Sequence, residues 1–201
     1  MSGETKTPAR TRNAAATREA ILRSARKAFA QGGYDGVGVR EIAKGAGVTA
    51  MLINRYFGSK EQLFAEVVAD TMAAPVILTQ ENLASGDLAA SMASALVDLT
   101  KPGGTPLDGF LIMFHSASSA RAGEISREQI EQHHQKVMTA ALEGDLAAER
   151  AALVLSIVAG VQVMRQMIGL NALTQADPQA LKALITPLLR GLIEGDRARV
   201  P

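Results

Sequence analysis

Apolar residues recur at helical spacing along most of this 201-residue chain, and no convincing run alternates apolar with polar residues as a half-buried strand does. Near the N-terminus, for example, an apolar stripe from Ile21 to Phe29 shares its segment with the cations Arg18, Arg23 and Arg26. Such a segment buries one face and exposes the other. We therefore predict an all-α fold.

Composition excludes several classes of protein. The chain has 47% apolar residues, no cysteine and three histidines, so disulfide scaffolds, thiolate catalysis and cysteine-based metal sites are excluded. Residues 1–13 are polar and basic, without the apolar run of a secretory signal. The stretch Ala151–Leu170 approaches the length of a membrane span, but Arg165 and two glutamines interrupt it. We expect a cytoplasmic protein without a membrane partner.

Charge is distributed unevenly along the chain. Residues 1–60 contain eleven Lys or Arg against four Asp or Glu, a formal charge of +7, whereas the remaining residues carry −6. Clustered cations suit a nucleic-acid-binding head, because they neutralise phosphates. A solvated basic tail explains the same charge, and the count alone leaves both interpretations open.

Capping residues and helix breakers predict the remaining helix boundaries. Gly32-Gly33 is expected to end the first helix, Pro187 to kink the last one, and Lys101-Pro102-Gly103-Gly104 to form a loop. The last two helices are expected at Leu146–Leu170 and at about 179–195. Five residues are predicted to cap helix starts: Thr17, Ser59, Thr105, Ser126 and Asp177.

The segment Val39–Phe64 is the most informative part of the chain. It predicts two short helices, Val39–Gly45 and Ala50–Phe57, joined by a tight turn at Gly47 and followed by Gly58. This pattern is a helix-turn-helix. Its predicted packing residues are Ile42, Ala43, Ala46, Val48, Ile53 and Phe57, and its predicted outward residues are Thr49, Ala50, Met51, Asn54, Arg55 and Tyr56.

Here the chain resembles the TetR family of transcriptional regulators. The resemblance covers about residues 15–65 and includes Ile42-Ala43, Ala46-Gly47-Val48-Thr49, Tyr56-Phe57 and Ser59-Lys60-Glu61-Gln62-Leu63-Phe64, in order and at matching spacing. It implies a homodimer that binds a palindromic operator through these heads. It also implies a divergent helical body that often binds an inducing ligand.

The resemblance assigns roles to individual residues. Thr49 matches the position that caps the recognition helix and touches a phosphate. Arg40 and Lys60 match positions that usually contact DNA, and Tyr56 matches the aromatic or histidine position that reaches the DNA backbone. An ordinary surface cation is the alternative for Lys60, and the quality of the helix-turn-helix favours the DNA contact over it.

Several positions depart from the family pattern. Asn54 replaces the usual tyrosine and could read adenine, while Gly38 replaces a threonine and removes a capping phosphate contact. Hydrogen-bond readout would then depend on Arg40, Asn54 and Arg55, although Arg55 could be a plain surface cation. The apolar trio Ala50, Met51 and Leu52 could meet thymine methyl groups, or Met51 and Leu52 could pack against the body.

The body contains no catalytic pairing of a nucleophile with a base, and its histidines lack the i, i+4 spacing of a helical metal site. We therefore expect no enzyme activity, no metal and no cofactor. Soft apolar side chains with a few polar neighbours predict an effector cavity, although core packing explains each of them as well. The candidates are Phe110, Met113, Phe114, His115, His134, Met138, Gln162 and Met164.

The two C-terminal helices are candidates for self-association. Ala151–Leu170 is apolar on most sides and has small residues along one side, and the last helix carries a leucine-rich stripe. Two such helices from each subunit would form a four-helix bundle, while an intrachain core explains the same residues. The stripe consists of Leu181, Leu184, Ile185, Leu188 and Leu192.

Together these patterns predict a disordered basic arm over residues 1–14, a helix-turn-helix domain over 15–60, and a helical ligand-binding and dimerisation domain over 61–201. The favoured function is a ligand-responsive repressor. A small helical ligand-binding protein or enzyme and a membrane-surface protein are the alternatives. Salt-dependent retention on duplex DNA separates them, because only the repressor requires it.

Overall fold

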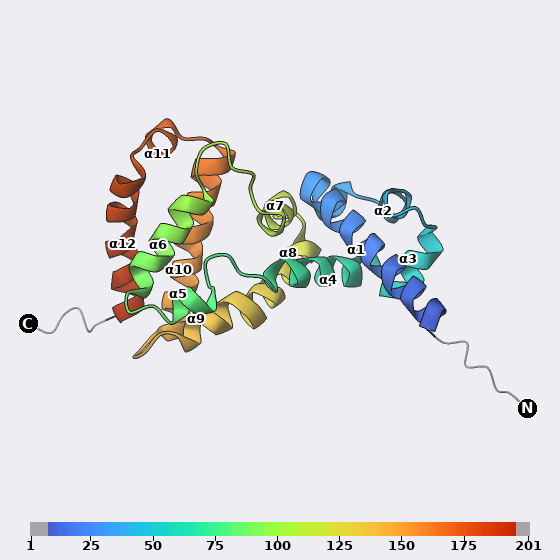
Figure 1. The fold of residues 1–201 in the computed structure, drawn as a ribbon, viewed down its shortest axis with the longest axis horizontal. Helices are drawn as coiled ribbons and strands as arrows, with labels where there is room; N and C mark the ends of the chain where they lie inside the picture. The colour runs from blue at the N-terminus through green and yellow to red at the C-terminus, as the bar shows by residue number, and fades with distance from the viewer. Residues whose placement is uncertain (1–7, 196–201) are drawn as a thin grey trace, which may run out of the picture. The chain divides into compact units, whose positions relative to one another are not determined.

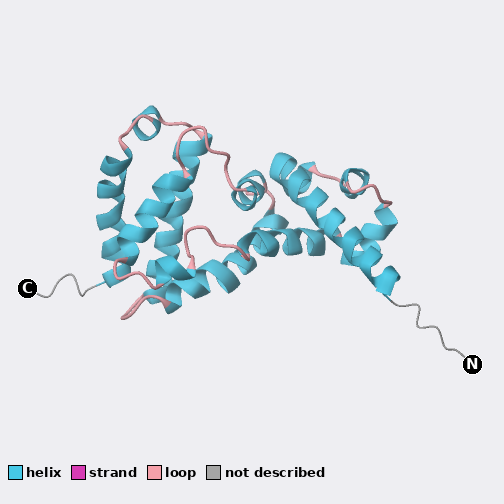
Figure 2. Cartoon of the chain, viewed as in Figure 1, coloured by secondary structure: helices cyan, strands magenta, loops and turns pink. Residues whose placement is uncertain are grey.

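The computed structural model describes residues 8–195, and every regular element in this range is a helix, as predicted (Figure 2). Within the described range two compact units form: residues 8–71 with 107–129, and residues 72–106 with 130–195. The first unit contains α1 (Pro8–Gly36), α2 (Val39–Gly45), α3 (Ala50–Phe57), α4 (Lys60–Met72, whose last residue belongs to the second unit), α7 (Asp108–His115) and most of α8 (Ala120–Ile130).

The core of the first unit is centred on α1, which buries the predicted residues Ile21, Ala25 and Phe29. The Phe29 ring contacts the Phe64 ring of α4 edge-on, with centroids 5.1 Å apart. The Tyr34 ring meets Phe64 in the same way at 5.0 Å. Aromatic pairs in this geometry stabilise a core beyond the area they bury, so α1 and α4 are firmly joined.

The N-terminal predictions need two corrections. Residues 1–7 of the predicted arm lie outside the described residues, but residues 8–14 belong to α1 and are helical. Thr17 is therefore not an N-cap: it lies inside α1, where its hydroxyl donates to the carbonyl of Asn13 at 2.8 Å. A threonine bonded four residues back is compatible with a continuing helix, which the capping signal alone could not distinguish.

Glycines shape the ends of these helices largely as expected. α1 is interrupted at Gly33, where φ is +65°, and a short helical segment continues to Gly36. The predicted bounds of α2 and α3 are confirmed, with Gly47 at φ +66° in the turn and Gly58 at φ +78° after α3. L-residues with side chains rarely adopt these conformations.

The second unit packs α6, α10 and α12 together, with α6 and α12 side by side (Figure 1). Its core includes Met92 and Leu96 of α6, Val154 of α10 and Leu189 of α12. The elements are α5 (Gln80–Leu83), α6 (Leu88–Leu99), the π-helical η1 (Glu131–Gln135), α9 (Lys136–Ala140), α10 (Ala147–Gln162), the π-helical η2 (Val163–Met167), α11 (Asn171–Thr174) and α12 (Pro178–Glu194).

Some predicted caps are correct. The Ser59 hydroxyl accepts from the backbone N–H of Gln62 at 3.2 Å, and Asp177 accepts from Gln179 and Ala180 at the start of α12. α12 continues as one helix across Pro187. The loop at residues 101–104 is also present.

Two predicted caps are wrong. Thr105 does not start a helix, because α7 begins only at Asp108. Ser126 lies inside α8, which begins six residues earlier, and Ser119 accepts from Ala122 N instead. In both places a local capping sequence competes with tertiary packing, which decides the boundary.

The compact units divide the chain differently from the predicted boundary at residue 60. Residues 107–129 belong with the N-terminal unit, because α7 packs along α1. Local sequence signals divide the chain into contiguous segments, so they do not reveal an element that returns to the first unit after 35 intervening residues.

Candidate nucleic-acid interface

The turn between α2 and α3 is fixed by backbone hydrogen bonds. Val48 N donates to Ala43 O at 2.9 Å, and Gly47 N donates to Lys44 O at 3.2 Å. At the other end of α2, Gly38 is extended and caps the helix through its carbonyl alone, which matches the loss of a side-chain cap at this position. The two short helices are thereby held at a defined angle, as a helix-turn-helix requires.

α2 packs closely against α1. The hydroxyl of Ser24 donates to the carbonyl of Ile42 at 2.8 Å. A β-carbon on Gly45 would lie inside contact distance of that hydroxyl, so a larger residue here would displace the Ser24 side chain from this bond. Four of the six predicted packing residues are buried, namely Ile42, Ala43, Ile53 and Phe57, while Ala46 and Val48 are half-buried.

The predicted outward residues of α3 do face away from this core. Met51 is 80% exposed, and Asn54 and Arg55 are also exposed. Ala50 and Tyr56 are half-buried. The exposed face is therefore a mixed surface of one cation, one amide and one apolar side chain, which is what major-groove contact by a recognition helix needs.

Thr49 occupies the N-cap of α3, as predicted, but its side chain makes no capping hydrogen bond. Leu52 N instead donates to the Thr49 carbonyl at 3.0 Å. The Thr49 side chain is exposed, so its hydroxyl is available to an external acceptor. Thr49 therefore caps α3 by its position and its carbonyl rather than by its hydroxyl, and the phosphate contact stays a prediction.

The cations of the first unit fall into two groups. Arg18, Arg23 and Arg26 form ion pairs with acidic side chains of the same unit. Among the described side chains, neither Arg40 nor Arg55 forms an ion pair, and both are exposed. Unpaired exposed guanidinium groups can contact phosphate or guanine without first breaking an ion pair.

Lys60 is the first residue of α4 and follows the end of α3 by three residues. Its ammonium nitrogen is 4.4 Å from the centroid of the Tyr34 ring, a cation–π contact. Burial raises the pKa of the Tyr34 phenol, and Glu61, which accepts its hydrogen bond, raises it further. Tyr34 therefore stays protonated and supports the lysine at the start of α4.

Arg18 is a positioning residue, although its sequence context indicates only a cation on the exposed face of α1. Its guanidinium forms an ion pair with Glu66 of α4 and lies 4.9 Å from the Phe57 ring centroid at the end of α3. It thus connects α1, α3 and α4. No local signal reveals this role, because Glu66 is 48 residues away in the sequence.

α7 is attached to the end of α1. A β-carbon on Gly33 would collide with the carbonyl of His115, so the glycine allows close approach as well as positive φ. Three hydrogen bonds join the two helices: His115 Nδ1 to Ala30 O (2.7 Å), Tyr34 N to Ser116 Oγ (2.9 Å) and Arg26 Nε to Asp108 Oδ2 (2.9 Å).

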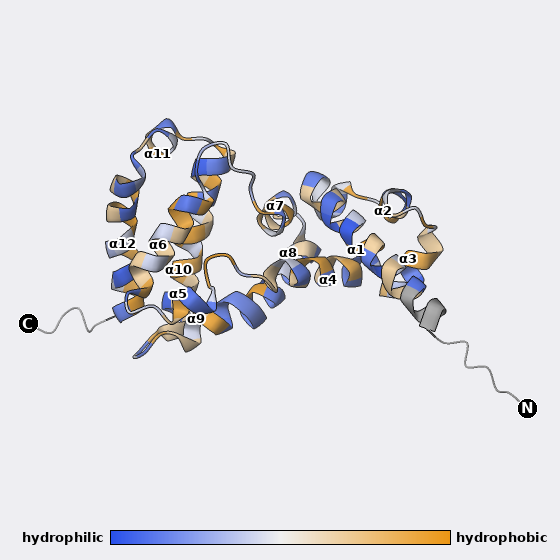
Figure 3. Ribbon diagram, viewed as in Figure 1, coloured by the Kyte–Doolittle hydropathy of each residue, from blue (hydrophilic) through white to orange (hydrophobic). Residues whose placement is uncertain are grey.

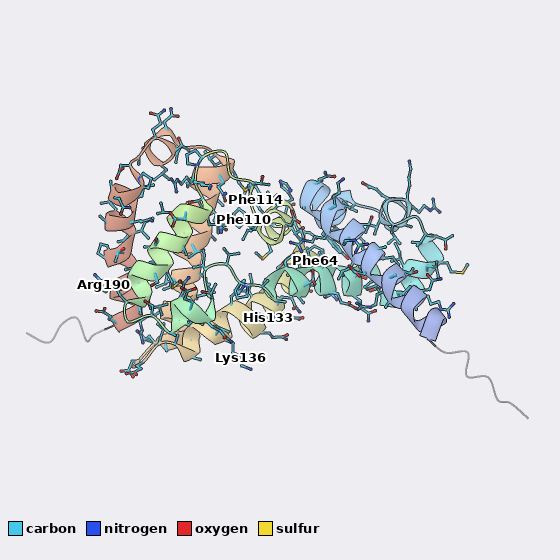
Figure 4. The ribbon with its side chains drawn as sticks, in the orientation of Figure 1. Phe64, Phe110, Phe114, His133, Lys136 and Arg190 are labelled. Carbon is cyan, nitrogen blue, oxygen red and sulfur yellow. The ribbon has the colours of Figure 1, made fainter. Side chains whose placement is uncertain are left out.

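Half of the predicted effector residues lie on α7 in the first unit. The rings of Phe110 and Phe114 are stacked with centroids 6.3 Å apart, and Phe114 is 40% exposed (Figure 4). Met113 is half-buried. His115 uses Nδ1 for the bond to Ala30, which leaves Nε2 for any other partner.

The other half lies in the second unit. Met138 is fully buried in the hydrophobic core, Gln162 is buried, and Met164 is 43% exposed. Burial lowers the pKa of the His134 imidazole, and the adjacent His133 lowers it further. The eight residues therefore do not form one cluster within a single unit, and their role as an effector site stays a prediction.

The predicted self-association helices show two faces. On α12, Leu181 and Ile185 are buried in the intrachain core, whereas Leu184 and Leu188 are 67% and 59% exposed. Leu153 of α10 is also 53% exposed. The helix Ala147–Met167 is by length and composition apolar enough to cross a membrane (Figure 3). Of its most apolar stretch of 18 residues, 17% is buried within the chain.

The described residues contain no group of three or more His, Cys, Asp or Glu side chains that could hold a metal ion.

Comparison with known proteins agrees with this architecture. Residues 21–67 match the family model described as bacterial regulatory proteins, tetR family, and residues 86–193 match the tetracyclin repressor-like C-terminal domain. A TetR-family regulator from Streptomyces coelicolor A3 has a TM-score of 0.58 at 22% identity, with 94% of this chain and 99% of that chain covered. AibR, solved with isovaleryl coenzyme A and operator DNA, has a TM-score of 0.59 at 14% identity, with 86% and 97% covered.

A curated relative is the HTH-type transcriptional repressor AcnR of Corynebacterium glutamicum, which is 35% identical over 66 residues. That alignment covers 33% of this chain and 35% of AcnR. The C-terminal family model alone spans more than half of the chain. The chain therefore belongs to the TetR family of bacterial transcriptional regulators.

Proposed function

We propose that this chain is a repressor that binds a palindromic operator as a homodimer and is released by a small apolar effector. The observation that carries the DNA part is the outward face of α3, where exposed Asn54 and Arg55 stand beside exposed Met51. Arg40 and Lys60 flank this face on α2 and α4. Cations on both sides would position the helix on phosphates while α3 reads bases.

The homodimer is supported by the apolar residues that α10 and α12 leave exposed. Burying apolar surface contributes about 25 cal/mol per Å², so Leu184 and Leu188 favour a contact that removes them from water. An isologous contact would place two copies of each helix in a four-helix bundle. It would also give the paired recognition helices the two-fold symmetry of a palindrome.

Release by an effector is supported by the contacts of α7. This helix carries Phe110 and Phe114 and is hydrogen-bonded to α1, which packs on α2. A molecule that shifts α7 would therefore pull on the helix that supports the head. The effector is expected to be uncharged or weakly polar, since the candidate residues offer no charged partner except histidine.

Linkage makes the release reciprocal. An effector that lowers operator affinity is bound more weakly by the DNA complex, by the same factor. The related repressor AcnR and the AibR complex with operator DNA favour the same type of function. A cytoplasmic location follows from a task performed on DNA.

Selection of bound fragments from random duplex DNA tests the proposal. The expected result is enrichment of an inverted repeat whose half-sites are about 34–36 Å, or one helical turn, apart or a multiple of this. Retention should fall steeply with added salt. Absence of any enriched sequence, with salt-independent retention, would favour a ligand-binding protein without a DNA role.

A further inference from the structure

The second unit holds a buried arginine that forms no ion pair among the described residues. Arg165 of η2 is only 4% exposed, and its hydrogen bonds go to neutral oxygens: Nε to Leu173 O (3.1 Å), Nη1 to Val97 O (2.7 Å) and Nη1 to Thr100 Oγ1 (2.9 Å). Among the described side chains, no carboxylate lies within ion-pair distance of it. A buried charge without a counter-ion is costly.

The remaining nitrogen of this guanidinium is unused. Nη2 has no hydrogen-bond partner among the described residues, although it carries two N–H groups. Every fully buried side-chain nitrogen in the described part of the chain has a partner, so Nη2, which has none, is not fully buried. Arg165 therefore both joins η2 to the end of α6 and presents a spare pair of donors.

Arg165 contributes to the wall of a pocket of about 440 Å³. Val97, Pro102, Ala176 and Pro178 supply apolar walls, from the end of α6, the following loop and the start of α12. The volume is within the range of small-molecule sites, about 300–1,000 Å³. The pocket shares no residue with the effector candidates described above.

The charges around the pocket favour an anion. Asp98 lies on the lining, but its carboxylate is engaged by Lys182 at 3.1 Å. Lys101, also on the lining, is exposed and forms no ion pair among the described residues. With that acid already paired, Arg165 and Lys101 leave a net positive charge facing the cavity.

Burial lowers the pKa of the Arg165 guanidinium, and attraction by Asp98 partly opposes this. An arginine nevertheless stays protonated at neutral pH, so burial acts as a cost of the charge rather than a route to neutrality. A bound anion would offset that cost. The π-helical turn that carries Arg165 is a form often found at functional sites.

We propose that this pocket binds a small organic carboxylate, with the carboxylate on Arg165 Nη2 and Lys101 and the apolar body against Val97, Pro102 and Ala176. The apolar walls distinguish this ligand from an inorganic anion, which would leave them in contact with water. The site is additional to the DNA-binding and effector roles, and its test uses no DNA.

Benzoate and hexanoate are suitable probes, with benzamide as the uncharged analogue of benzoate and inorganic phosphate as the anion without an apolar body. Calorimetric titration of the full chain should give binding of at least one carboxylate, with benzamide and phosphate at least ten-fold weaker. In a ¹⁵N-labelled sample the amide signals of Thr174 and Ala176 should shift with the carboxylate. Failure of both carboxylates to bind, or equal binding of benzamide or phosphate, would overturn the proposal.

Variants locate the site. Arg165→Gln should weaken carboxylate binding at least ten-fold, Ala176→Leu should abolish it by filling the pocket, and Lys101→Gln should weaken it two- to five-fold. Lys136→Gln, which removes an exposed cation from α9, is the matched control and should bind as wild type. If Arg165→Gln does not fold, the other two variants decide: unchanged binding in both refutes the site.

Discussion

The outward face of α3 and the outward faces of α10 and α12 are both exposed in a single chain, but their chemistry differs. α3 presents Asn54 and Arg55 beside one apolar side chain, whereas α10 and α12 present leucines such as Leu153 and Leu188. Exposed cations are well solvated and can bind phosphates. Clustered exposed leucines are unfavourable in water, and contact with a second protein surface would remove them from it. We infer that one chain carries two separate interfaces, one for DNA and one for its own copy.

The largest effect is expected from a charge on the apolar face. Leu188→Glu should weaken dimerisation at least 100-fold, because an unpaired carboxylate buried in an interface costs several kcal/mol. Sedimentation should then show a monomer, with its helical circular dichroism intact because Leu188 is 59% exposed in the single chain. Lys136→Glu on exposed α9 is the control. An unaltered dimer in Leu188→Glu would place the interface elsewhere.

The next largest effect tests the packing of α7 against the end of α1. Gly33→Ala should lower the free energy of unfolding by about 3 kcal/mol, since the residue has positive φ and the new methyl group would collide with His115. Urea denaturation measures this. Gly36→Ala, with nothing within 4 Å of its β-carbon, should change stability by less than about 1 kcal/mol. Equal stabilities of the two variants would argue against the close approach of α7 to α1.

Substitutions of two cations, one on α3 and one at the start of α4, should weaken DNA binding in different ways. Arg55→Ala should cost about 1–3 kcal/mol in operator affinity and relax the preference at one position per half-site. Lys60→Ala should weaken all sequences alike and reduce the slope of log K against log salt by about one. Lys136→Ala is the matched control. Wild-type affinity in both head variants, measured by fluorescence anisotropy, would rule out this face as the DNA surface.

The smallest effect concerns the pH dependence of stability in the second unit, which contains His134. Because burial lowers the pKa of His134, the unfolded chain takes up the proton at a higher pH than the folded chain. The free energy of unfolding contributed by this group is therefore complete above the ordinary pKa near 6.5 and falls as pH drops below it, by at most about 1.4 kcal/mol per pH unit.

His134→Gln should flatten that fall, and an NMR titration of the wild type should show the imidazole titrating below its ordinary range. A titration at or above pH 6.5 would contradict the burial of this ring. The head variants above should leave this pH dependence unchanged, which separates the two regions.

The head is the region that the sequence predicts best. The bounds of α2 and α3, the glycine turn and most of the packing residues follow from local signals. The chain needs positive φ at residues 47 and 58, and glycine is the residue that adopts it most readily. What the sequence cannot provide is the side-chain framework around it. The ion pair of Arg18 with Glu66 depends on how helices pack, not on neighbouring residues.

The body is less predictable for the same reason. Ser126 has a capping sequence, yet packing extends α8 through it, and α7 joins the N-terminal unit although it follows 35 residues of the second one. Arg165 shows the clearest limit. Its sequence context suggests only an interruption of an apolar helix, whereas the structure buries it between α6 and α11 with a spare nitrogen.

Hydroxyl-radical footprinting of the wild-type protein on its selected duplex tests the two interfaces together most directly. Two symmetric protected patches on one face of the DNA, about one helical turn or a multiple of it apart, are the expected result, because each copy places one α3 in a major groove. The symmetry should disappear in Leu188→Glu. A single asymmetric patch in the wild type, or no protection, would contradict a dimer that reads DNA through α3.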